Sequence, residues 1–218
     1  QIYSHCIVIM TWIFQISFVA FTIYFLDLTL VRLGYKGRWF QLHSLANMAV
    51  CYLTYNDLIA CLNNPNNSSE KIDSFIYLYI ILVTHIYHCV AFKIRFEDWM
   101  HHITSVLIPS PIFIMYPIKS NSVGCFFICG LPGAIDYIML TLYKNEVIQK
   151  KTQKMMSTYL NTYIRVPGSI VSVYLLYKDS VLLDSYLIKC LACIVYINAC
   201  FYGKQSIEAY ERFLQIEL

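Results

Sequence analysis

Residues 6–26 read CIVIMTWIFQISFVAFTIYFL, a run of 21 residues without a formal charge. A helix needs about 20 mainly apolar residues to cross a bilayer, so this run predicts a transmembrane helix. The whole chain of 218 residues has the same character, because 58% of it is hydrophobic and 13% is charged. An ordinary soluble domain is about 45–50% apolar and 25% charged. The composition therefore indicates a membrane protein and argues against a soluble enzyme or a disordered tail.

Six further stretches have the length and low charge of membrane-spanning helices. They are Phe40–Leu62, Ser74–Phe92, Trp99–Pro117, Val123–Tyr143, Thr158–Tyr177 and Ser185–Gly203. The fourth of the seven stretches is the weakest, because Pro109 and Pro111 favour a kinked or re-entrant segment. The sequence thus predicts an all-α, polytopic membrane protein with about seven transmembrane helices. Because it begins at Gln1 rather than Met, it leaves open whether residues precede it.

The connections between the predicted helices differ in charge. Connections 27–39, 93–98 and 144–157 and the tail 204–218 hold eleven Lys or Arg, whereas connections 63–73, 118–122 and 178–184 hold three. Cytosolic loops carry the excess of Lys and Arg, which predicts a cytosolic C-terminus. Asn66 and Asn67 begin two overlapping glycosylation sequons on the predicted lumenal side. We expect an integral protein of the endoplasmic reticulum, with the mitochondrial inner membrane or another membrane as the alternative.

Neither nucleic acid nor a metal is expected as a partner. The net charge of +3 comes from 16 Lys and Arg against 13 Asp and Glu, which is too slight for a nucleic-acid footprint. The nine cysteines lie nearly all in apolar runs, and Cys190-x-x-Cys193 lacks a second such pair, so we interpret them as small residues of membrane helices. Two histidine pairs resemble the boxes of a di-iron lipid oxidase, but the usual third box is missing. We predict no metal and no cofactor.

Polar side chains in the predicted helices gather at one depth. Ionisable groups inside a bilayer are costly, and they mark function unless they pair or reach the interface. We counted the depth of each polar side chain at about 1.5 Å per residue. Eight polar side chains lie within roughly 3–11 Å of the cytosolic helix ends: His43, Asn47, His85, His88, His101, His102, Asp136 and Arg165. We expect a polar chamber that opens toward the cytosol, with Asp136 and Arg165 as a buried ion pair. Packing histidines, a purely structural ion pair and an interfacial His101–His102 pair are the alternatives.

Three segments resemble the TLC-domain family, which includes ceramide synthases and several non-enzymatic membrane proteins. Residues 95–104, RFEDWMHHIT, are similar to that family's acidic residue, Met and paired histidines. Residues 130–136, GLPGAID, resemble the segment of its second motif, and residues 159–167, YLNTYIRVP, its later helix that ends in Arg and Pro. The resemblance covers about Gly37 to Gly203. It implies a barrel-like bundle of six helices preceded by an N-terminal helix.

The second motif departs from the ceramide synthases. Leu131 to Gly133 occupy the region where its His-Asp would stand, Asp136 alone remains, and Leu140 lies near the position of its Glu. Asp98 also lies closer to His101 than the matching acid does in those enzymes. The resemblance therefore favours the branch credited with lipid binding or membrane-composition control.

The resemblance and the charge pattern together divide the chain into three parts. Residues 1–36 form an N-terminal helix and basic loop, residues 37–203 a TLC-like membrane domain, and residues 204–218 a cytosolic amphipathic tail. We expect the tail to be a helix that lies on the membrane surface.

Three functions remain open. The first is lipid binding or lipid homeostasis, in which His43, Asn47, His85, His88, Asp136 and Arg165 hold a membrane lipid. The second is a ceramide-synthase-like acyl transfer, with acyl-CoA as substrate and His101 or His102 as the catalytic residue. The third is a structural subunit whose partners are neighbouring membrane proteins. The sequence names neither the lipid nor the oligomeric state.

Overall fold

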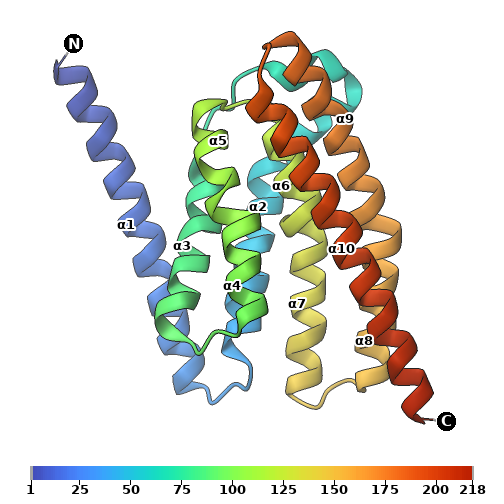
Figure 1. Ribbon diagram of the computed structural model, residues 1–218. Helices are drawn as coiled ribbons and strands as arrows, with labels where there is room; N and C mark the ends of the chain where they lie inside the picture. The colour runs from blue at the N-terminus through green and yellow to red at the C-terminus, as the bar shows by residue number, and fades with distance from the viewer. Residues whose placement is uncertain (1, 218) are drawn as a thin grey trace.

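The computed structural model describes residues 2–217 and is helical throughout that range except in its connections and an isolated β-bridge between Lys71 and Ile118 (Figure 1). Gln1, Leu218 and the side chains of residues 2–9 and 217, among them Cys6, lie outside the described part. Four helices are uninterrupted: α1 (Ile2–Arg32), α2 (Arg38–Asn63), α3 (Ile76–Ala91) and α10 (Tyr186–Glu217). A short 3₁₀ helix, η1 (Pro65–Ser69), lies between α2 and α3.

Three further helical rods each contain one wide π turn. The first rod consists of α4 (Phe96–His102), η2 (Ile103–Leu107) and α5 (Pro109–Met115). The second consists of α6 (Lys119–Cys125), η3 (Phe126–Gly130) and α7 (Leu131–Lys144). The third consists of α8 (Lys150–Leu160), η4 (Asn161–Arg165) and α9 (Val166–Leu182).

A proline explains the place of each wide turn. Proline has no N–H, and its ring collides with the carbonyl four residues earlier. Pro109, Pro132 and Pro167 each follow a wide turn, and the residue four before each proline lies inside that turn. The extra residue of a π turn moves the orphaned carbonyl away from the ring. The fourth predicted helix is therefore a helical rod from Phe96 to Met115 that a π turn interrupts.

Four helices of the described residues have the length and composition of membrane-spanning helices. Met10–Arg32, Arg38–Asn63, Lys119–Lys144 and Tyr186–Ile216 are long and apolar enough to cross a bilayer, and Ile76–Ala91 is apolar but shorter. Many large apolar side chains also face outward, such as Phe14 at 71% exposure and Val90 at 82%. Soluble monomers rarely expose apolar surface on that scale. These features are compatible with an integral membrane protein, whereas the count of seven spans stays a prediction.

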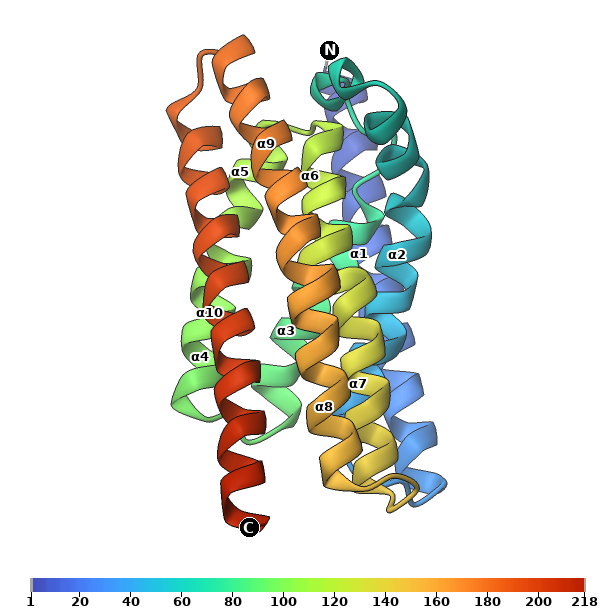
Figure 2. The ribbon, with the colours of Figure 1, turned by 90° about the vertical axis from the view of Figure 1, so that its right-hand side faces the viewer.

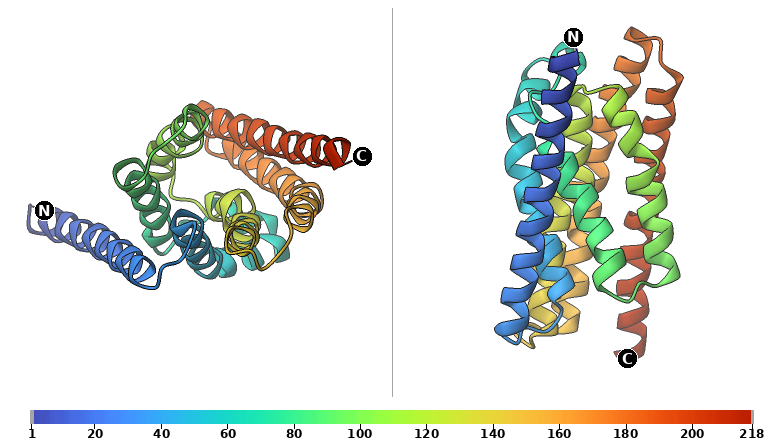
Figure 3. Two further views of the ribbon diagram at one scale, coloured as in Figure 1. Left: turned by 90° about the horizontal axis from the view of Figure 1, so that it is seen from below. Right: turned by 90° about the vertical axis from the view of Figure 1, so that its left-hand side faces the viewer.

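The helices after α1 are arranged in a ring (Figures 2 and 3). Around the ring, α3 contacts α2, α2 contacts the α6–α7 rod, and that rod contacts the α8–α9 rod. Helix α10 then packs along α8 and α9, and the α4–α5 rod closes the ring between α10 and α3. Helix α1 packs outside the ring, against α3 and α2. An apolar core around Val50, Leu176 and Leu191 fills part of the interior.

Asp27 fastens α1 to the ring. Its carboxylate accepts a 2.6 Å hydrogen bond from Arg38 Nη1 and a 2.8 Å bond from the Tyr87 hydroxyl. The Arg38 guanidinium also lies over the ring of Phe92. Asp27 is only 7% exposed although the sequence places it in a basic loop. A buried carboxylate needs such charged and hydrogen-bonded partners, so this contact is a specific joint.

The connections fall at two ends of the bundle. The α1–α2, α3–α4 and α7–α8 connections share one end with the C-terminus, and the N-terminus lies with the others at the opposite end (Figure 1). The predicted topology grouped the connections in the same way when their Lys and Arg residues were compared. We call the first the histidine end, after the five histidines described below, and the second the loop end, after the connection that contains η1.

Two helices extend beyond the predicted spans at the histidine end. Residues 204–217 continue α10 without a break, so they are not a separate helix. Helix α8 begins at Lys150, not at Thr158, and it pairs with this continuation. The Thr158 hydroxyl donates to the carbonyl of Ser206, and Lys150 lies over the ring of Phe213. Packing between the two helices outweighs the low apolarity of either segment.

Candidate functional site

Five histidines from three helices come together inside the histidine end. They are His43 on α2, His85 and His88 on α3, and His101 and His102 on α4. Ring centroids lie 5.0 Å apart for His43–His85 and His85–His102, and 5.1 Å apart for His88–His102. His101 is half-buried and the other four are buried. The structure thus assembles the histidine part of the predicted site.

His102 lies in the middle of a short hydrogen-bonded chain. Its Nε2 is 3.3 Å from His88 Nδ1, and its Nδ1 is 3.2 Å from Cys89 Sγ. Both ring nitrogens are therefore engaged. Cys89 was not among the predicted site residues, because a single cysteine in an apolar helix resembles any other small packing residue.

His101 belongs to a second chain, which reaches α10 and the α8–α9 rod. Its Nδ1 is 2.8 Å from the Tyr202 hydroxyl, and the Arg165 guanidinium lies 5.7 Å from the centre of the Tyr202 ring. Arg165 Nη1 donates a 2.9 Å bond to Asn161 Oδ1. Tyr202 was missed by the sequence reasoning, which gave α10 no polar role at this depth.

His85 has a defined tautomer. Its Nδ1 is 2.7 Å from the carbonyl oxygen of Ile81. A carbonyl only accepts, so Nδ1 carries the proton, and the neutral ring keeps a lone pair on Nε2. His43 Nδ1 is buried and has no hydrogen-bond partner. The cluster therefore presents free acceptor or donor positions on two adjacent rings.

Aromatic rings pack among the histidines. Trp39 stacks on His88 and also contacts His43, and Tyr137 lies edge-on to His43 with 4.8 Å between centroids. Trp39 precedes His43 by one helical turn, and Tyr137 comes from α7. Neither residue was predicted as part of the site. At the level of His43 the interior is thus lined by packed rings.

Asn47 and Asp136 differ from expectation in their surroundings. Asn47 is buried at the crossing of α2 and α7, where a Cβ on Gly133 would collide with its amide. Asp136 is half-buried, and its Oδ1 has no hydrogen-bond partner. Close packing of α2 against α7 explains the burial of Asn47. Asp136, in contrast, has a free hydrogen-bond acceptor.

The predicted ion pair between Asp136 and Arg165 is wrong. Arg165 instead contacts Asn161 and Tyr202. The depth count treated the sixth helix as a regular helix that starts at Thr158. The wide turn η4 adds a residue just before Arg165, which changes the direction of the side chains that follow it.

Asp98 caps α4 next to the cluster. Its carboxylate accepts bonds from the backbone N–H and the guanidinium of Arg95, so it satisfies a backbone N–H at the start of the helix. Partial burial would raise the pKa of Asp98, but the Arg95 bonds outweigh burial and hold that pKa below its ordinary value. The carboxylate thus stays ionised and fixes the start of the helix that carries His101 and His102.

A metal centre is not evident in the described part of the chain. Its side chains contain no group of three or more His, Cys, Asp or Glu with the geometry to hold a metal ion. Four of the five imidazoles, all except His43, bond to one another, to Tyr202, to Cys89 or to the backbone instead.

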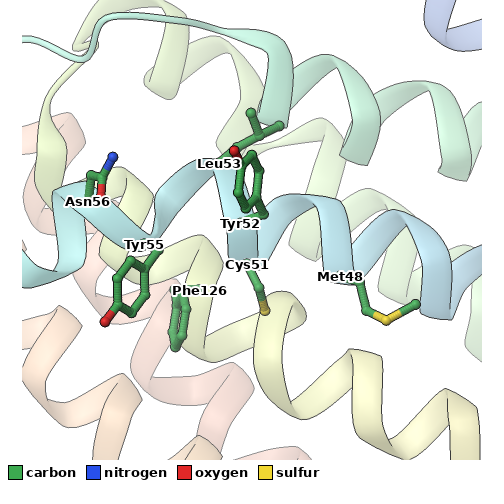
Figure 4. Close-up of a pocket in the computed structure, with 7 residues that line it drawn as sticks. All are labelled: Met48, Cys51, Tyr52, Leu53, Tyr55, Asn56 and Phe126. Atoms are coloured by element: carbon green, nitrogen blue, oxygen red, sulfur yellow. The ribbon is translucent and has the colours of Figure 1, made fainter.

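A shallow groove of about 700 Å³ lies elsewhere, along α2 (Figure 4). It is lined by Met48, Cys51, Tyr52, Leu53, Tyr55, Asn56 and Phe126. Most of these side chains are exposed on the outer face of the bundle. None of the predicted site residues lines it, so the groove is separate from the histidine cluster.

The chain was compared with protein-family models, with curated proteins and with solved structures, and it matches none of them. The site is therefore interpreted from its own geometry.

Proposed function

We propose that this chain is an integral membrane protein that binds a membrane lipid or a fatty-acyl group within its helix ring, and that it acts in lipid binding or membrane lipid homeostasis. The polar part of the ligand lies at the histidine cluster and the acyl part between the helices. The observation that carries the proposal is the set of unpaired polar atoms at this end. His43 Nδ1, Asp136 Oδ1 and Arg165 Nε are buried without a partner.

Unpaired buried polar atoms are costly, and native proteins satisfy the great majority of them. The three atoms offer a guanidinium donor, a carboxylate acceptor and an imidazole that serves as either. A lipid headgroup with hydroxyl, amide or phosphate groups matches that mixture. The apolar outer surface of the ring places the protein among lipids, so such a ligand is present at high concentration.

The resemblance to the TLC-domain family supports the same proposal. His101 and His102 match its paired histidines, and the ring of six helical rods with α1 outside agrees with the expected barrel-like bundle. We further propose that all seven rods cross the membrane, with the histidine end on the cytosolic side. The basic connections at that end support this orientation, and the endoplasmic reticulum is the proposed location.

Lipid retention tests the proposal. The full chain is purified in a mild detergent, and its bound lipids are identified by native mass spectrometry and extraction. We expect one lipid class to be enriched over its share in the host membrane. The double variant His43→Ala/Arg165→Leu should retain at least about tenfold less of it, and the matched control Tyr52→Ala, on the outer face of α2, should retain as much as the wild type.

Two results would contradict the proposal. The first is a wild type that carries lipids only in the proportions of the host membrane. The second is a double variant that melts like the wild type and still retains the enriched lipid unchanged. A stable complex with another membrane protein, without an enriched lipid, would favour a structural subunit instead.

A second candidate function is acyl transfer from acyl-CoA to a lipid amine or hydroxyl. The contact that favours it is His101 Nδ1 with the Tyr202 hydroxyl, because it orients the ring and leaves His101 Nε2 available. There His101 would take the proton of the attacking group as a general base. His102 suits this role less, because both its nitrogens are engaged. Turnover of acyl-CoA by the wild type, lost in His101→Ala, would support this candidate.

A further inference from the structure

Cys89 adds a thiol to the histidine cluster, and no role above uses it. We propose that Cys89 is a nucleophile that accepts an acyl group from a thioester donor, with His102 as its base and His88 as the residue that orients His102. The inference rests on the proposed function, since it assumes that acyl groups reach the cluster. It deepens that function by naming an acyl thioester as a substrate.

The geometry has the three parts that an activated nucleophile requires. Cys89 Sγ lies 3.2 Å from His102 Nδ1, which is within hydrogen-bond reach for sulfur. His102 Nε2 lies 3.3 Å from His88 Nδ1 on the far side of the ring. A nucleophile, a base and a third group that fixes the base are the arrangement by which weak nucleophiles are activated.

The hydrogen bonds define a consistent set of proton positions. When the Cys89 thiol donates to His102 Nδ1, the neutral His102 ring carries its proton on Nε2 and donates it to His88 Nδ1. His88 then carries its own proton on Nε2. Each contact then has one donor and one acceptor, and in this set of proton positions His102 Nδ1 can accept the thiol proton.

The other described cysteines lack this arrangement. Of the eight whose side chains the structure describes, Cys89 alone bonds to a histidine. Cys190, Cys193 and Cys200 are exposed on α10, and Cys125 is buried. Cys89 is half-buried near the end of α3, so it combines access with a base.

The surroundings fit an anionic thioester carrier such as coenzyme A. Lys93 and Arg95 follow Cys89 by four and six residues in the α3–α4 connection, where Arg95 is paired with Asp98 and the exposed Lys93 has no ion-pair partner among the described side chains. At this end, the α3–α4 connection lies closer to the middle of the bundle than the α1–α2 and α7–α8 connections do (Figure 1). A phosphate-bearing carrier can therefore bind at Lys93 while its acyl chain enters the ring.

The step is a thioester exchange. Cys89 Sγ attacks the acyl carbon, and its proton passes to His102 Nδ1. The bond between the acyl carbon and the donor sulfur breaks, and the donor thiolate takes the proton from His102. The products are Cys89 S-acyl thioester and the free donor thiol, with no oxidant or reductant required.

Labelling of the full-length protein tests the proposal. The purified wild type is incubated with alkyne-tagged palmitoyl-CoA, and thioester label is scored by its release with neutral hydroxylamine and located by peptide mass spectrometry. We expect most of the label on Cys89, although Cys193 is more exposed. Cys89→Ala should lose the label, and His102→Gln should slow it about 100-fold, whereas Cys193→Ala should label like the wild type.

Several outcomes would overturn the proposal. The wild type alone can overturn it, if Cys193 or Cys200 carries more label than Cys89. Undiminished label in Cys89→Ala, or an unchanged rate in a His102→Gln protein that melts like the wild type, would do so as well. If the wild type takes no label yet retains its lipid, the Cys89 proposal fails and lipid binding stands. If Cys89 is labelled but no lipid is enriched, the proposed lipid binding fails and the Cys89 proposal stands.

Discussion

Buried polar side chains occur at both ends of the bundle, but they are used differently. At the loop end they join helices to connections. Ser68 of η1 donates a 2.6 Å bond to Asp179 of α9, and the Asn121 amide donates a 2.5 Å bond to the carbonyl of Tyr116. At the histidine end the bonds join helix to helix, as between His102 and His88.

This difference distinguishes a structural joint from a candidate site. Asp179 and Ser68 are both fully buried, so their bond is shielded from solvent and holds the η1 connection against the ring. Unpaired buried atoms occur at both ends, among them Asp179 Oδ2 and Asn121 Oδ1 at the loop end, whereas the histidine end gathers imidazole, carboxylate and guanidinium groups. Burial of a polar group therefore does not by itself indicate function, and the nature of its partners decides between the two roles.

The largest expected effect is on the loop end. Asp179→Ala removes the charged acceptor of Ser68, whose hydroxyl keeps only the Pro65 carbonyl 2.8 Å away, and loss of the bond to a buried carboxylate should lower the free energy of unfolding by about 1.5–3 kcal/mol. Thermal and denaturant unfolding in detergent measure the change. Asp73→Ala, which removes an exposed acid at the same end, is the control and should have little effect. Lipid retention per folded molecule should stay unchanged, and its loss would contradict the structural role of this end.

A smaller effect on stability is expected at the histidine end. Tyr202→Phe removes one hydrogen bond to His101 and should cost about 1 kcal/mol. Because Tyr202 orients His101 and supports Arg165, retention of the enriched lipid should fall by about fivefold, the factor that corresponds to this free energy. Tyr196→Phe on the exposed face of α10 is the matched control. A Tyr202→Phe protein that retains lipid like the wild type would show that this chain of contacts is structural.

The smallest effect is expected outside both clusters, where the α1–α2 and α7–α8 connections meet. Lys36 Nζ lies 2.9 Å from Glu146 Oε1, and Lys36 holds the pKa of Glu146 below its ordinary value. A lowered carboxyl pKa stabilises the fold above the ordinary pKa and loses that contribution as the pH falls through the folded-state pKa. Lys36→Ala should therefore melt slightly below the wild type at pH 7, and the two melting temperatures should converge below about pH 4. A difference that grows at acid pH would contradict this account.

The sequence predicted the grouping of the histidines correctly because depth is a local property. Distance along a helix follows from its rise per residue and the point where it enters the membrane. His43, His88 and His101 each lie a few residues from a helix end, and the alternation of the connections brings those ends together. No property of the distant chain is needed for that inference.

The direction of side chains around a helix was harder to predict. The wide turn η4 changes the helical phase before Arg165, and the prediction of an Asp136–Arg165 ion pair failed there. The sequence signal was present, since Pro167 marks the wide turn. Tyr202 and Trp39 were missed for another reason, because aromatic residues are common in every helix of this chain and their neighbours depend on packing.

The sequence by itself determined that the chain is built of apolar helices, that its basic connections lie at one end, and that five of its six histidines share one level. Hydropathy, charge and rise per residue are properties of each segment alone. Tertiary structure decided which nitrogen meets which partner, that Cys89 contacts His102, and that Asp27 anchors α1. Such contacts depend on how each helix is rotated and how closely it packs against a neighbour from a distant part of the chain, which no single segment specifies.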